Sequence, residues 1–155
     1  MGSNLIHFLH LLATVVWIGG IIFMEVVFYP SLAAIDPQQG GKALAVAAKR
    51  FTIIAWSCII ILIITGLLKT PSGWLFDTST TIGTLLLVKY LLIVAAIVVG
   101  VVITFVVAPK LISGSPKPGE KPSPEFLKSQ KQVKRLAMTN MTVGVLILLV
   151  TAFLL

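Results

Sequence analysis

Four long runs of apolar residues constrain the fold of this chain more than any other feature. They cover about residues 5–29, 51–68, 82–108 and 133–155, each close to or above the roughly 20 residues that a helix needs to cross a bilayer. The runs are continuous and do not alternate with polar residues, so they predict helices and not barrel strands. Together with the short connections, they predict an all-α integral membrane domain over residues 1–155, an antiparallel four-helix bundle with up-down-up-down topology.

The composition excludes the soluble classes of protein. Of the 155 residues, 57% are hydrophobic and 11% are charged, whereas a soluble chain has roughly 25% charged residues. The net charge of +7 is confined almost entirely to two connections, so it indicates a lipid bilayer and not nucleic acid as the partner. The single cysteine, Cys58, excludes an internal disulfide and a four-thiolate zinc site.

The basic residues predict the orientation of the chain. Ten of the twelve lie in the connection 30–50 or between residue 109 and the start of the fourth run, on one side of the predicted bundle. By the positive-inside rule this side is cytoplasmic, so the chain lies in the cytoplasmic (inner) membrane with both termini outside. Residues 112–130, rich in Gly, Ser, Pro and Lys, are expected to form a flexible cytoplasmic linker.

Two histidines near the start of the first run are candidate ligands. At about 100° per residue, His10, Trp17 and Met24 form a stripe along one helix face, and His7 lies one turn from His10. Both rings are therefore expected to face the same space inside the bundle. The alternatives are an interfacial role for His7 and a purely structural, hydrogen-bonded role for His10.

Lys89 is a charged residue about seven residues into the third run. A lysine in a span costs roughly 2.5–3.5 kcal/mol on insertion scales, so such residues are usually functional. Counting the helical rise from the outer surface places it within roughly 3 Å of the layer of His10. The alternative is that Lys89 extends outward to a lipid phosphate or to the terminal carboxylate of Leu155.

Soft metal donors lie deeper in the predicted bundle. Thioether and thiolate groups favour Cu(I), and imidazole suits copper, iron and zinc, although methionine also commonly fills protein cores. The candidate donors are His7, His10, Met24, Cys58, Met138 and Met141. Asn140 and Thr142 are instead expected to form hydrogen bonds between helices.

Several of these residues form a familiar pattern. The sequence has His10 and Trp17 followed by Gly19-Gly20, then Arg50-Phe51, Thr65-Gly66, and Lys89 inside Thr84-Leu-Leu-Leu-Val-Lys89. This pattern resembles the copper-resistance D (CopD) domain family, and the resemblance implies copper uptake or handling across the inner membrane.

A second family is similar to the chain at fewer positions. The membrane protoporphyrinogen oxidase family HemJ shares the spacing of His10 and Trp17 and the embedded lysine. Its first helix continues into a Leu-Pro-Arg stretch where this chain has Met24-Glu25, which argues against porphyrinogen oxidation here but is compatible with haem binding.

The sequence leaves three functions open. In the first, the bundle binds or moves a copper ion through the six soft and imidazole donors. In the second, it binds haem b, with His10 as axial ligand, Lys89 near a propionate, and His7 and Trp17 beside the cofactor; such a protein could be redox-active. In the third, it is a non-catalytic partner subunit. The sequence favours a non-enzymatic role and leaves association into homo-oligomers open.

The predicted orientation can be tested by labelling single cysteines in a Cys58→Ala background. In intact cells or right-side-out vesicles, Thr78→Cys should react with a membrane-impermeant maleimide, because it lies outside. Gly114→Cys should react only after the membrane is permeabilised. The reverse pattern would contradict the positive-inside assignment.

Overall fold

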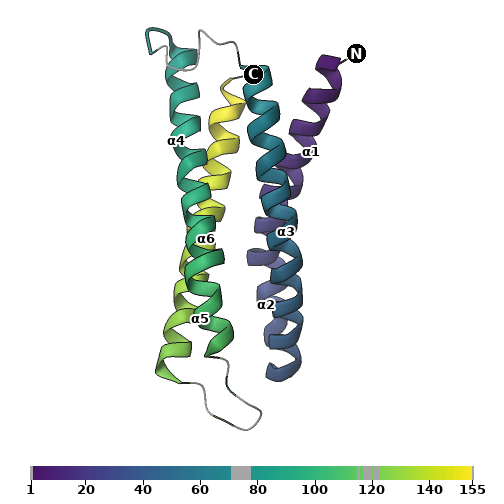
Figure 1. Ribbon diagram of the computed structural model, residues 1–155, viewed down its shortest axis with the longest axis vertical. Coiled ribbons are helices and arrows are strands. Elements are labelled where there is room, and N and C mark those ends of the chain that lie inside the picture. The colour runs from purple at the N-terminus through teal and green to yellow at the C-terminus, as the bar shows by residue number, and fades with distance from the viewer. Residues whose placement is uncertain (1, 71–77, 115, 117–119, 121–122, 155) are drawn as a thin grey trace.

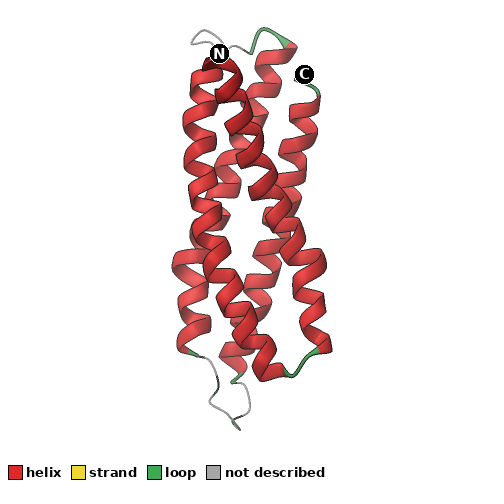
Figure 2. Ribbon diagram, turned by 90° about the vertical axis from the view of Figure 1, so that its right-hand side faces the viewer, coloured by secondary structure: helices red, strands yellow, loops and turns green. Residues whose placement is uncertain are grey.

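The computed structural model describes residues 2–70, 78–114, 116, 120 and 123–154, with residues 37 and 38 described by their backbone alone. These residues form four long helices that lie side by side, and both ends of the chain lie at the same end of the bundle (Figures 1 and 2). The four candidate spans are Gly2–Ala34, Gln39–Lys69, Thr81–Ser113 and Pro124–Ala152. The predicted all-α four-helix membrane bundle is thus confirmed.

Two of the four helices are interrupted by short segments of different helical geometry. The first consists of α1 (Gly2–Phe23), the π-helical η1 (Met24–Phe28), α2 (Tyr29–Ser31) and the 3-10 turn η2 (Leu32–Ala34). The second is α3 (Pro37–Lys69). The third consists of α4 (Thr81–Val101), the π-helical η4 (Val102–Val107) and α5 (Ala108–Ser113), and the fourth is α6 (Pro124–Ala152).

Polar capping residues decide where three of these helices begin. The side chains of Asp36, Thr80 and Ser123 accept hydrogen bonds from backbone N–H groups three residues ahead, at 3.2, 3.0 and 3.1 Å. Asp36 and Ser123 are each followed by proline, which suits the first helical position because its missing N–H has no partner there. Because of these caps, α3 and α6 begin well before the apolar runs 51–68 and 133–155.

The helices are therefore longer than the apolar runs that predicted them. Residues 124–130, expected in the flexible linker 112–130, form the first two turns of α6, and residues 112 and 113 end α5. Most of residues 114–123 lie outside the described part of the chain. A 33-residue helix is about 50 Å long, so the ends of these helices extend beyond a hydrocarbon core of about 30 Å.

Both π-helical segments end two residues before a proline. η1 ends at Phe28 ahead of Pro30, and η4 ends at Val107 ahead of Pro109. A proline within a helix loses one backbone hydrogen bond, and its ring clashes with the carbonyl group four residues earlier. Widening the preceding turn gives that carbonyl room, which explains why the helices continue through both prolines.

The bundle consists of two helical hairpins. α1 packs mainly on α3, α4 packs mainly on α6, and contacts between α1 and α6 join the two pairs. The buried core lies where these helices meet. It comprises Ala13, Trp17, Ile18 and Ile21 of α1, Cys58 and Ile59 of α3, Ala96 of α4 and Ile147 of α6.

Most large apolar side chains point away from this core. Phe105 and Val15, for example, are both 67% exposed, as expected for a surface that lipid covers. Because lipid chains are as apolar as the core, the helices associate through close packing and not through removal of apolar surface from water.

Close packing depends on Gly144 of α6, which faces Ile18 of α1. A Cβ atom at position 144 would lie 3.4 Å from Cγ2 of Ile18, whereas one at Gly19 would meet nothing within 4 Å. We expect Gly144→Leu to destabilise the protein by about 1–3 kcal/mol, the usual cost of overpacking, and Gly19→Leu to have little effect. Thermal unfolding in detergent measures both variants. Equal losses would contradict the packing described here.

Candidate functional site

His10 lies inside the bundle, where α1 meets α3. Its ring is half-buried, and its Nδ1 atom lies 2.7 Å from Oγ1 of Thr65. Gly66 leaves room beside the ring, because a Cβ atom at that position would lie 3.6 Å from Cε1 of His10. No described residue contacts the second ring nitrogen, Nε2, by a hydrogen bond.

Thr65 is a buried polar residue at the centre of this contact. It is 5% exposed, and its Oγ1 atom donates to the backbone oxygen of Ile61 at 2.6 Å. A hydroxyl that bonds to the preceding turn satisfies its proton within its own helix. In the sequence, Thr65 stands out only through the family resemblance, and no role at the site was predicted for it.

His7 contacts the same helix one turn further towards the termini. The Nζ atom of Lys69, at the end of α3, lies 2.7 Å from Nδ1 of His7, and both residues are exposed. The two histidines therefore both face α3, in line with the stripe predicted for α1. Lys69 itself was missed, because only the antiparallel alignment of α1 with α3 brings it opposite His7.

Lys89 lies at this end of the bundle but on the other hairpin. Oγ1 of Thr70, the residue after α3, lies 2.9 Å from the hydroxyl of Tyr90 in α4, and this hydrogen bond joins the two helices. Lys69 comes directly before Thr70 and Lys89 directly before Tyr90, so both lysines lie at this end of the bundle. The alternative partner, the carboxylate of Leu155, lies outside the described residues.

The remaining candidates lie deeper and are spread along the bundle. Trp17 and Cys58 belong to the buried core, and Met141 packs against it. Met24 lies within η1, and Met138 is 42% exposed. Cys58 is seven residues from Thr65, or about 10 Å along α3 from the layer of His10. Within the described part of the chain, no three His, Cys, Asp or Glu residues form a metal-holding group.

The two polar residues expected to join helices behave differently. Oγ1 of Thr142 donates to the backbone oxygen of Met138 within α6, at 3.0 Å. Oδ1 of Asn140 is buried and has no hydrogen-bond partner among the described residues. The observed hydrogen bonds between helices come instead from His10, Lys69, Thr70 and Trp56.

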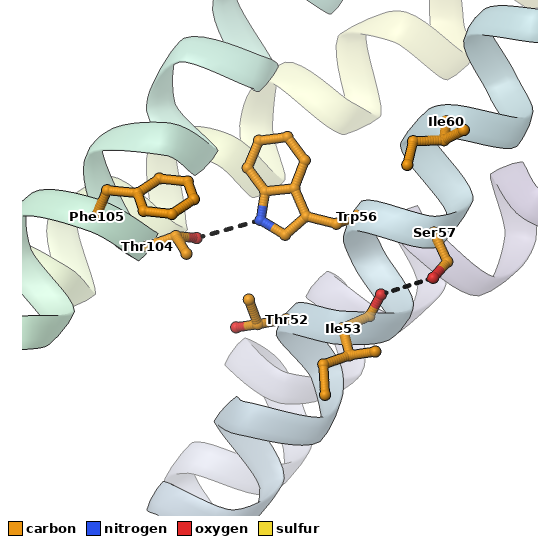
Figure 3. A pocket seen from close by; sticks show the side chains of 7 residues that line it. All are labelled: Thr52, Ile53, Trp56, Ser57, Ile60, Thr104 and Phe105. Carbon is orange, nitrogen blue, oxygen red and sulfur yellow. Dashed lines mark hydrogen bonds between the residues drawn. The ribbon is translucent and has the colours of Figure 1, made fainter.

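A separate cleft, lined by neither histidine, lies between α3 and η4. Figure 3 shows the side chains that line it. It has a volume of about 470 Å³, and Nε1 of Trp56 donates to Oγ1 of Thr104 across it at 3.4 Å. The hydroxyls of Thr52 and Ser57 donate to backbone oxygens of their own helix, so the walls are mainly apolar. None of the predicted ligands lines this cleft.

Comparison with known proteins gives one result. A family model described as copper resistance protein D (CopD) matches residues 45–154, which include Thr65, Lys89 and most of the sulfur donors. His7, His10, Trp17 and Met24 precede the matched region. No curated protein and no solved structure matches the chain.

The alignment of α1 with α3 carries the geometry of this site and can be tested by cross-linking. In a Cys58→Ala background, the pair His10→Cys and Thr65→Cys should be joined by a short bifunctional thiol reagent, because these side chains touch. The control pair, Val15→Cys and Thr65→Cys, should not be joined, because Val15 is 67% exposed. Mass spectrometry detects the linked product. Efficient linking of the control pair alone would refute the alignment.

Proposed function

Because the chain belongs to the copper resistance protein D family, we propose that it binds copper and moves it across the cytoplasmic membrane. The family match covers 110 of the 155 residues and the helices α4, η4, α5 and α6 in full. His10 is the copper ligand near the outer surface in this proposal, and the sulfur donors receive the ion further inward.

The environment of His10 is the observation that carries the proposal. One ring nitrogen is held by Thr65 at 2.7 Å, while the other has no partner among the described residues. A histidine that binds a metal usually has its second nitrogen fixed by a hydrogen bond, which orients the ring. Imidazole nitrogen is a suitable donor to copper.

The spacing of the sulfur donors suits an ion that passes through the bundle and does not stay. Cys58 lies about 10 Å below the layer of His10, Met141 and Met138 lie near the middle of α6, and Met24 lies further towards the opposite end, in η1. Thiolate and thioether groups select Cu(I). Conduction also requires sites that are individually weak enough to release the ion, and separated donors meet this requirement better than one multidentate site.

A second candidate, a haem b protein, is favoured by the two lysines near His10. Ammonium groups at Lys69 and Lys89, which lie at the same end of the bundle as His10, would repel a lone copper cation but would pair with the propionates of a haem. Of the donors present, His10 could serve as the axial ligand, because its second ring nitrogen has no partner among the described residues. Bound haem would supply one-electron redox chemistry.

Metal binding and an absorption spectrum, both measured on one purified preparation, distinguish the copper function from the haem function. We expect the wild-type protein to bind Cu(I) in competition with bicinchoninate, and His10→Ala to lose at least about tenfold in affinity, because a ligand is removed. Asn4→Ala, an exposed position on the same helix, serves as the control and should bind as the wild type does.

An absorption spectrum of the same samples addresses the alternatives. A Soret band after haem-replete expression that disappears in His10→Ala would favour the haem b function over the copper function. If neither copper nor haem binds, the proposal fails and the role of a non-catalytic partner subunit is favoured.

A further inference from the structure

The hydroxyl of Thr65 makes two short contacts that together determine the proton positions around it. Its Oγ1 atom lies 2.6 Å from the backbone oxygen of Ile61 and 2.7 Å from Nδ1 of His10. A hydroxyl has one proton to donate and two lone pairs that accept. Only one of the two contacts can therefore receive the threonine proton.

That proton belongs to Ile61, because a carbonyl oxygen can only accept. The backbone oxygen of Leu62, 3.5 Å away, is a second acceptor on the same side. Towards His10 the hydroxyl therefore presents a lone pair, and Nδ1 must carry the hydrogen that completes the bond. In a neutral imidazole the other nitrogen, Nε2, is then unprotonated and holds a free lone pair.

The other histidine is in the opposite situation. Lys69 has an ammonium group, which donates hydrogen bonds and accepts none, so Nδ1 of His7 must be the acceptor in the 2.7 Å contact. A neutral His7 then carries its proton on Nε2. It offers no lone pair there as long as Lys69 stays in place.

We propose that Thr65 is a positioning residue that holds His10 in the Nδ1–H tautomer, so that His10 and not His7 presents Nε2 as a metal donor at rest. The ligand role of His10 rests on the proposed function, but its tautomer does not. Thr65 is 5% exposed, so little water can compete with its hydroxyl for Nδ1, and one hydrogen bond suffices to select the tautomer.

With these tautomers, His10 is more accessible to a metal ion than His7. A metal can approach Nε2 of His10 without first displacing a proton or a side chain. To bind through either nitrogen of His7, it must displace Lys69 or remove the Nε2 proton. Gly66 supports the first route, because it leaves the Cε1 edge of the His10 ring, adjacent to Nε2, free of a side chain.

Nitrogen-15 NMR of histidine-labelled protein in detergent tests the tautomers directly. The chain has two histidines, so a tag-free sample gives two ring patterns, and His7→Ala assigns them. At mildly alkaline pH we expect His10 to be protonated at Nδ1 and His7 at Nε2. A wild-type His10 protonated at Nε2 would overturn the proposal without any variant being needed.

Three substitutions identify the cause. Thr65→Val removes the hydroxyl at nearly constant volume and should shift His10 towards the Nε2–H tautomer, whereas Thr65→Ser should keep Nδ1–H. Thr14→Val is the matched control, because its hydroxyl donates only to the backbone oxygen of His10, at 2.8 Å. An unchanged His10 pattern in a folded Thr65→Val protein would show that Thr65 does not set the tautomer.

Ligand binding provides the second readout. With Cu(I) as the probe, Thr65→Val should bind about 10–100-fold more weakly, and Thr65→Ser should bind within a few-fold of the wild type. Unchanged Cu(I) binding in Thr65→Val would refute the positioning role. If no Cu(I) binds to any form while the tautomers are as expected, the copper function fails and the tautomer assignment stands.

Discussion

The exclusion of water from the bilayer interior is the constraint that shapes this molecule. Any polar group that the chain carries into the hydrocarbon must find its partner within the protein, because no solvent is available to it. Thr52, Ser57 and Thr142 meet this requirement within their own helices. The ring of His10 extends beyond the backbone of its own helix, so its partner has to come from another helix. Its contact with Thr65 therefore joins α1 to α3.

The sequence predicted the fold class well because apolar length alone decides whether a helix can span a membrane. It predicted the helix ends poorly, because the capping side chains of Asp36 and Ser123 are polar and hydropathy does not register them. The π-helical turn from Met24 was also unpredictable. It adds a residue to the turn, so the regular stripe drawn from His10 through Trp17 does not continue unchanged beyond it.

The candidate site was predicted only in part. Histidines and a lysine inside apolar runs are conspicuous in a sequence, and the structure places His7, His10 and Lys89 at the same end of the bundle. Their partners were missed because Thr65 and Lys69 are ordinary residues until α1 and α3 are aligned.

The division of the bundle into two hairpins has a consequence for biogenesis. Each hairpin consists of consecutive helices, and its internal interface is larger than the contacts that join the pairs. The first hairpin can thus insert and close, forming the pair of His10 and Thr65, before the second leaves the ribosome. The bonds that bridge the hairpins, from Trp56 to Thr104 and from Thr70 to Tyr90, can form only afterwards. Lys89 of α4 therefore reaches this end of the bundle only after the contact between His10 and Thr65 can have formed.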